Sequence, residues 1–241
     1  PYPAYEAIGI RNIGGDYNQL GTSLLQIENE FYGTIRPKRT VRRGERPLHA
    51  LREHGVEYVE VRLMDLDPFE NVGITAQTMR LLDVFLLHCL LSDSPPDTPA
   101  EIAECKHNQH LTAERGRESG LLLERGGQSV RLSDWAGQIL AECAPIAATL
   151  DQAQGTGDYG QALRQAQAVL ADSALAPSAR VLAAMQAQPG CGFEAFSFAR
   201  SEQARDRLLA LPWTAAQQAH YEALAAQSLA DQKDIEAQDS L

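Results

Sequence analysis

The chain has 241 residues and a formal net charge of −11, from 21 Lys and Arg against 32 Asp and Glu. This acidic balance argues against a nucleic-acid-binding protein, which needs clustered cations on one face. Hydrophobic residues make up 44% of the chain, which is enough for a buried interior. No uncharged apolar run reaches the length of a membrane span, about 18 residues.

The four cysteines indicate a reducing compartment. They stand at positions 89, 105, 143 and 191, far apart and in no CxxC pair, so we expect free thiols in the cytoplasm rather than a disulfide framework. The sequence begins at Pro1, without an initiator Met, and runs at once into apolar, strand-like residues. We therefore expect a fragment that lacks the N-terminal half of a longer protein.

Two regions of different composition are predicted to form an α+β fold. Residues 1–72 are rich in Gly, Pro, Arg and Tyr, with apolar runs of strand length, and Gly14-Gly15-Asp16 predicts a hairpin turn between the first two strands. Residues 73–241 are rich in Ala, Leu, Gln and Glu with helical spacing. Helices are predicted at about 76–92, 99–118, 133–153, 158–171, 177–187, 193–210 and 214–236.

The segment from Leu24 to Tyr32 alternates in the manner of a strand. The residues expected on its polar face are Gln26, Glu28, Glu30 and Tyr32, and those on its apolar face are Leu25, Ile27 and Phe31. A polar face of this kind lines a cleft in some proteins and meets solvent in most antiparallel sheets. The alternation alone leaves both readings open.

A dense cationic cluster follows, the only one in this acidic sequence. Its members are Arg36, Lys38, Arg39, Arg42, Arg43 and Arg46. Guanidinium groups bind phosphate oxygens in paired hydrogen bonds, so the cluster suits a polyphosphate, although a solvated loop explains it equally well. No GxxxxGK[ST] loop is present, so a nucleotide would not be held by a Walker-type cradle.

The run from Val56 to Asp65 is the most informative strand. Its alternation puts Tyr58, Glu60 and Arg62 on one face, and an apolar set on the other. The first face therefore places a carboxylate beside a guanidinium.

Three segments resemble glutamate–cysteine ligase of the proteobacterial type: YPAYEAIGIRN, LQIENEFYGTIRPKR and GVEYVEVRLMDLDPF. The resemblance is close over about residues 2–92 and diffuse beyond. The glutamine synthetase superfamily, to which this ligase belongs, has a related E-x-R strand followed by Asp and Pro. Here that pattern is Glu60-Val61-Arg62, then Asp65 or Asp67, then Pro68.

The resemblance implies a fold and a reaction. Residues 1–72 would supply strands of a curved antiparallel sheet of the glutamine synthetase type, completed by upstream strands, and residues 73–241 a helical region packing on it. ATP would phosphorylate the glutamate side chain, and the cysteine amine would displace phosphate from the γ-glutamyl phosphate, in the first step of glutathione biosynthesis. The implied partners are glutamate, cysteine and ATP, with Mg²⁺ or Mn²⁺ as cofactor. From the charge and the short apolar runs we expect neither nucleic acid nor a membrane as partner.

The same resemblance implies roles for individual residues. Glu60 matches the metal-ligating carboxylate, Arg62 the catalytic cation that steadies the phosphoryl group, and Tyr32 the tyrosine that hydrogen-bonds the cysteine carboxylate. The candidates for ATP or phosphate binding are Arg36, Lys38 and Arg39, to which the resemblance assigns no individual roles.

Two other hypotheses stay open. Another carboxylate–amine ligase of the superfamily would keep Glu60 and Arg62 but use a different amine. Alternatively, the chain is a non-catalytic subunit or interaction module. Because the family supplies further metal carboxylates and substrate contacts from sequence upstream of this chain, we expect the isolated 241 residues to be inactive. The oligomeric state is left open.

Overall fold

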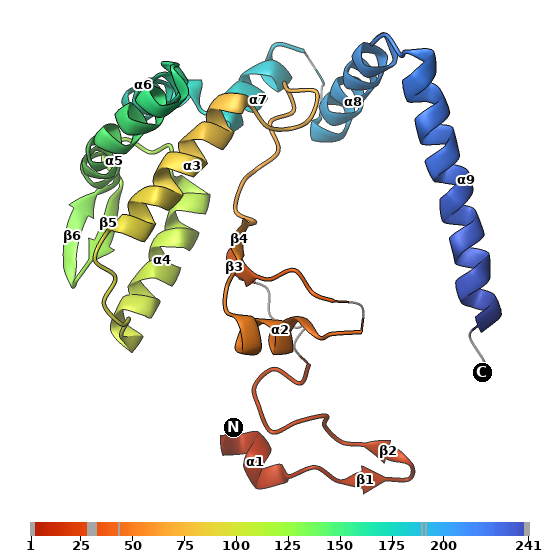
Figure 1. Ribbon diagram of the computed structural model, residues 1–241. Helices are drawn as coiled ribbons and strands as arrows, with labels where there is room; N and C mark the ends of the chain where they lie inside the picture. Colours follow the sequence, from red (N-terminus) through yellow and green to blue (C-terminus); the bar gives the residue numbers. More distant parts are fainter. Residues whose placement is uncertain (1–2, 28–32, 43, 189, 191, 239–241) are drawn as a thin grey trace. The chain divides into compact units, whose positions relative to one another are not determined.

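The computed structural model describes residues 3–27, 33–42, 44–188, 190 and 192–238. By their contacts, the residues divide into two compact units, Pro1–Asp65 and Leu66–Leu241. Figure 1 shows the elements in chain order. Helices occur together with antiparallel strand pairs, which confirms the predicted α+β class.

The first unit contains short helices and two strand pairs. Its elements are α1 (Pro3–Ile8), β1 (Asn12–Ile13), β2 (Asp16–Tyr17), β3 (Ile35–Lys38), α2 (Pro47–His54) and β4 (Tyr58–Val61). β1 pairs with β2, and β3 with β4, in both cases antiparallel. Gly14 and Gly15 join β1 to β2 with φ of +66° and +103°, a left-handed conformation that glycine adopts without strain, so the predicted hairpin turn is confirmed.

The helices and strands of this unit differ in part from the sequence-based expectations. α1 and α2 were not predicted; α2 begins at Pro47, which suits a first helical position, and ends at Gly55 with φ of 73°. The strand predicted at 56–65 is shorter, covering Tyr58–Val61.

The strand predicted from Leu24 is wrong over residues 24–27, which form bends, and residues 28–32 lie outside the described part of the chain. The Gln26 side chain explains the bends. Its Oε1 accepts hydrogen bonds from the backbone of Leu20 (2.8 Å) and Gly21 (3.1 Å), and its Nε2 donates to the Ser23 carbonyl (3.0 Å). These local bonds fold the backbone back on itself instead of leaving it extended.

The second unit is mainly helical. Its elements are α3 (Ala76–Leu91), α4 (Pro99–Arg115), β5 (Leu122–Arg125), β6 (Gln128–Arg131), α5 (Leu132–Gln154), α6 (Asp158–Ala171), the 3-10 turn η2 (Ser173–Leu175), α7 (Pro177–Gln186), α8 (Phe193–Leu209) and α9 (Ala215–Gln238). Every helix predicted after residue 73 is present. Thr75 and Thr98 begin α3 and α4, their hydroxyls accepting hydrogen bonds from the N–H of Thr78 and Glu101.

The β5–β6 hairpin was missed, because only helices were predicted after residue 73. Both glycines have positive φ, 59° and 74°, the requirement of the tight two-residue turn that matches strand twist. The alternating residues on either side of two glycines were the signal that could have identified it. Helix α4 holds this turn: the Glu104 carboxylate accepts hydrogen bonds from the N–H of Gly126 (2.9 Å) and Gly127 (2.8 Å).

The hydrophobic core of the second unit lies among α3, α5 and α6, which Figure 1 shows together. Its buried residues are Val84, Cys143, Ala147, Tyr159 and Leu163. Burial raises the pKa of the Cys143 thiol, so this cysteine is an apolar packing group. Among the described residues, no helix is long and apolar enough to cross a membrane.

Candidate functional site

The polar faces of β3 and β4 meet in the first unit. Arg36 lies opposite Glu60 and Lys38 opposite Tyr58 in the antiparallel register. Opposite residues in such a pair project from the same side of the sheet. The cationic segment and the E-x-R strand, separate in the sequence, therefore contribute to one polar surface.

Glu60 lies between two cations on this surface. The Lys38 Nζ is 3.3 Å from Glu60 Oε2, and the Arg62 Nε is 4.0 Å from Oε1. The side chains are partly exposed: 36% for Lys38, 38% for Glu60 and 44% for Arg62. Ion pairs at this exposure contribute about 0–1 kcal/mol to stability, so the pairing can rearrange at small cost.

The carboxylate oxygens of Glu60 determine whether it fits a divalent metal. Oε2 is buried and accepts no hydrogen bond, although it lies near the Lys38 ammonium. A hard carboxylate oxygen in this condition suits Mg²⁺, which proteins usually hold by one or two carboxylates together with water and substrate phosphates. Within the described ranges, no group of three His, Cys, Asp or Glu side chains gathers to hold a metal. Glu60 therefore fits as one ligand of a metal site, not as a complete site.

Arg39 lies apart from this surface. Its NH1 donates to the His54 carbonyl at the end of α2 (2.7 Å), and its Nε is 3.6 Å from the Glu57 carboxylate. Glu57 also accepts the N–H of Thr40 (2.9 Å), and this bond is the main cause that lowers the pKa of Glu57, with Arg39 a smaller one. Arg39 thus connects α2 to the end of β3, while Arg36 and Lys38 share the face of Glu60. Tyr32 lies outside the described residues.

The Asp-Pro pair that follows the E-x-R strand begins the second unit and forms a hydrogen-bonded loop. The Asp67 carboxylate accepts the N–H of Phe69 (2.9 Å), and the Asp67 N–H donates to the Gly73 carbonyl (2.8 Å). Gly73 has a φ of +75°, which strains any residue with a side chain, and a Cβ there would meet Leu66 Cδ2 at 2.7 Å, so the end of the Leu66 side chain would have to shift.

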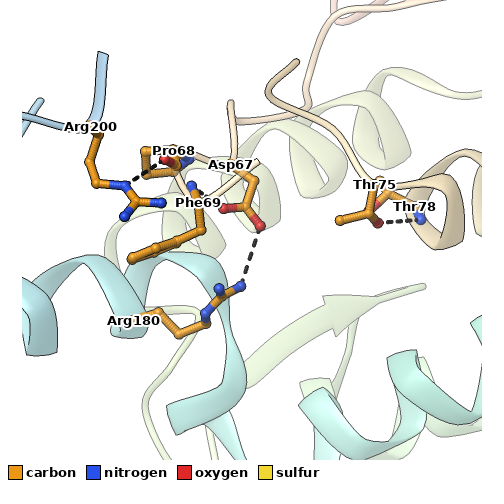
Figure 2. A network of polar contacts seen from close by, with 7 residues as sticks. All are labelled: Asp67, Pro68, Phe69, Thr75, Thr78, Arg180 and Arg200. Carbon is orange, nitrogen blue, oxygen red and sulfur yellow. Dashed lines mark hydrogen bonds and ion pairs between the residues drawn. The ribbon is translucent and has the colours of Figure 1, made fainter. Parts of the chain in front are cut away.

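Two arginines from distant helices hold this loop (Figure 2). Arg180 of α7 lies 3.3 Å from the Asp67 carboxylate, and the Arg200 Nε of α8 donates to the Pro68 carbonyl (2.9 Å). The Phe69 ring lies between the two guanidiniums, at 4.3 Å from Arg180 and 4.8 Å from Arg200. Cations over an aromatic face are attracted to its electron density.

Sequence reasoning missed Arg180 and Arg200. Arg180 is 113 positions from Asp67, and Arg200 is 132 positions from Pro68. No local spacing connects residues so far apart. Asp67 was considered only as part of a family motif, and the structure adds that its carboxylate organises the loop.

Comparison with protein families gives a match over the first part of the chain. Residues 1–112 match the family described as glutamate-cysteine ligase. Curated relatives named glutamate–cysteine ligase include that of Janthinobacterium sp. (strain Marseille), 46% identical over 98% of this chain and 44% of the relative. That of Azotobacter vinelandii (strain DJ) is 45% identical over 100% of this chain and 45% of the relative. The chain spans about half the length of the curated relatives it matches.

Solved structures give a consistent result. A crystal structure of glutamate–cysteine ligase from Francisella tularensis in complex with AMP matches 100% of this chain and 47% of that protein, with a TM-score of 0.81 and 32% identity. A bifunctional glutathione synthetase from Pasteurella multocida matches 75% of this chain with a TM-score of 0.54. Its identity is 19%, so the likeness concerns the fold alone.

Proposed function

Because the chain belongs to the glutamate–cysteine ligase family, we propose that it supplies part of an active site that joins the glutamate γ-carboxylate to the cysteine amine with ATP. The observation that carries this proposal is the meeting of Lys38, Glu60 and Arg62 on one face of the β3–β4 pair. Proteins handle phosphoryl groups with such a combination of a carboxylate, for a metal, and fixed cations.

The proposed reaction has two steps. A γ-carboxylate oxygen of glutamate attacks the γ-phosphorus of ATP, forming γ-glutamyl phosphate and releasing ADP. The cysteine amine then attacks the acyl carbon, a C–N bond forms, the C–O bond to phosphate breaks, and the nitrogen loses a proton. Negative charge accumulates on the transferred phosphoryl group in the first step, so stabilising that charge is the main requirement of the site.

Each residue has a part in this scheme. Glu60 would hold a divalent metal such as Mg²⁺ through its carboxylate oxygens, and the metal, when bound, would neutralise phosphate oxygens. Arg62, beside Glu60, presents its guanidinium to the phosphoryl group. Arg36 and Lys38 share this face and are the nucleotide-phosphate candidates that the structure supports; Arg39, already bound to the end of α2, remains a weaker one.

Tyr32 is proposed to hydrogen-bond the cysteine carboxylate, from its motif alone. The AMP bound in the Francisella tularensis relative supports an adenine nucleotide as co-substrate. The reaction would be the first step of glutathione biosynthesis, and we propose a cytoplasmic location for it.

The experiment compares Glu60→Gln and Arg62→Gln with Glu53→Gln and Arg52→Gln, matched changes on the exposed face of α2. The protein is assayed at its full natural length for γ-glutamylcysteine formation. We expect the first pair to lower kcat on the order of 100-fold or more, because stabilisation of developing charge is lost, and the second pair to leave it unchanged. Equal effects of the two pairs would refute the assignment. Faster ATP turnover with ammonia or another amine than with cysteine would indicate a different ligase of the superfamily.

A further inference from the structure

We propose that the Lys38 ammonium occupies Glu60 until the metal binds, and then transfers to a phosphate group of the nucleotide. This inference rests on the proposed function, because it requires Glu60 to be a metal ligand. It gives Lys38 a role separate from those of the other cations in its segment.

The starting arrangement is visible in the ion pairs. Lys38 Nζ is 3.3 Å from Glu60 Oε2, while Arg62 lies on the side of the other oxygen, Oε1, at 4.0 Å. Oε2 is buried and accepts no hydrogen bond, so the ammonium compensates its charge without a well-directed bond. The oxygen nearest to Lys38 is thus a buried acceptor to which no hydrogen bond is directed within the described part of the chain.

A metal and the ammonium compete for this oxygen. A divalent cation lies about 2.1 Å from its carboxylate ligand, and an ammonium 3.3 Å from the same oxygen would be its close neighbour. Like charges at such a separation repel each other, and more so where water is partly excluded. Metal binding to Oε2 therefore requires Lys38 to move.

Lys38 is suited to this movement. Its ammonium is a compact charge on a flexible four-carbon stem with three rotatable donors, whereas a guanidinium is held in a rigid planar fork. Its side chain is 36% exposed, so leaving Glu60 costs little. The backbone of Lys38 stays fixed by β3–β4 pairing, including the bond from the Glu57 N–H to its carbonyl (2.9 Å), so only the side chain must move.

The new partner follows from charge. The nucleotide phosphates that would accompany the metal are strong hydrogen-bond acceptors for a lysine, and Lys38 lies on the same face as Glu60. The exchange keeps every charge compensated at each stage. It also lowers the affinity of Glu60 for metal that arrives without nucleotide, because such metal displaces the ammonium and offers it no new partner.

The test measures the two ligands separately in the full-length protein. Mn²⁺ alone is titrated by the electron paramagnetic resonance of the free ion, and a non-hydrolysable ATP analogue with Mg²⁺ is titrated by calorimetry. For Lys38→Met we expect binding of Mn²⁺ alone to tighten on the order of fivefold, since a competing cation is gone. We expect the analogue to bind about tenfold more weakly, since a charge-assisted phosphate contact is lost.

Three further variants make each outcome decisive. Lys106→Met removes an exposed lysine of α4 and should change neither affinity. Lys38→Arg keeps a cation that holds Glu60 more firmly, so Mn²⁺ should bind no better than to the wild type while the analogue is retained. Glu60→Gln should remove the Mn²⁺ site. Circular dichroism verifies that every variant folds.

The failures can be told apart. If Glu60→Gln leaves Mn²⁺ binding intact, the metal assignment in the proposed function is wrong and the exchange fails with it. If Glu60→Gln removes the site but Lys38→Met leaves Mn²⁺ affinity unchanged or weaker, the exchange alone is refuted. Tighter Mn²⁺ binding with unchanged affinity for the analogue would also refute it, because the phosphate would not be the new partner of Lys38.

Discussion

Some single side chains in this protein connect two segments by hydrogen-bonding to backbone groups, in the place of a neighbouring strand. Asn108 of α4 is the clearest case, with an exposed fraction of only 8%. Its Nδ2 donates to the Glu124 carbonyl (2.7 Å), and its Oδ1 accepts the Glu124 N–H (2.9 Å). The side chain thereby pairs with β5 as the edge of another strand would, and joins the hairpin to the helix.

Asn108→Ala is expected to destabilise the protein by about 1–3 kcal/mol, because both Glu124 backbone groups lose a part-buried partner. Urea unfolding monitored by circular dichroism measures the change. Gln109→Ala, at the next and exposed position of the same helix, is the control and should stay near the wild-type value. A loss no greater than that of the control would show that the Asn108 bonds are replaced by water.

Connections between elements are stabilised by carboxylates at helix ends. Asp151, in the last turn of α5, accepts hydrogen bonds from the N–H of Tyr159 and Gly160, both at 2.9 Å, in the first turn of α6. Gly155, between them, has a φ of 66°, which lets the chain reverse. The negative charge also lies at the N-terminus of α6, where the helix dipole favours it.

This junction gives stability a pH dependence. Burial by itself raises the pKa of Asp151, but the bonds from Gly160, Tyr159 and Thr156 outweigh it, so the pKa lies below its ordinary value. A carboxyl group whose pKa is lowered by folding stabilises the protein at pH values above its unfolded-state pKa of about 3.9. This stabilisation is lost as the pH falls through the folded-state pKa.

Asp151→Asn should therefore be less stable than the wild type at pH 7, and the difference in melting temperature should shrink as pH falls below about 4. Thermal unfolding between pH 7 and pH 3 measures it. Asp234→Asn, on exposed α9, serves as the matched control. A difference that stays constant with pH would mean that the charge of Asp151 does not contribute.

At the scale of the whole molecule, the two units differ in how much apolar surface they bury. The second unit has a core among α3, α5 and α6. In the described part of the first unit, Ala50 is the one buried hydrophobic residue, and large apolar side chains on both strand pairs are exposed, among them Ile13, Tyr17, Ile35 and Val59. α9, described throughout Ala215–Gln238, also has no buried residue.

A unit with so little burial gains little stability from its own packing. We therefore expect the 241 residues alone to bind a hydrophobic dye and to form no γ-glutamylcysteine. Co-expression with the N-terminal half of the Azotobacter vinelandii relative should lower dye binding and give detectable ligase activity. Activity of the 241 residues alone at the level of the mixture would refute this prediction.

Periodicity in the sequence was sufficient for the helices after residue 73. Their apolar spacing, capping threonines and terminal glycines act within a few residues, so the prediction needed no knowledge of the fold. The two-residue repeat of a strand also predicted that Glu60 and Arg62 lie on the same side. The resemblance of three segments identified the family. Those segments include the residues whose role the strand alternation alone left open.

Tertiary structure decided what depends on partners distant in sequence. Lys38 reaches Glu60 because β3 and β4 pair in one register, Arg39 turns away to the end of α2, and Arg180 and Arg200 enclose Phe69 from two later helices. Alternation fixes the face of a strand on which a side chain lies, but not which strand adjoins that face. That choice is made by backbone pairing and packing between remote segments, which no local pattern encodes.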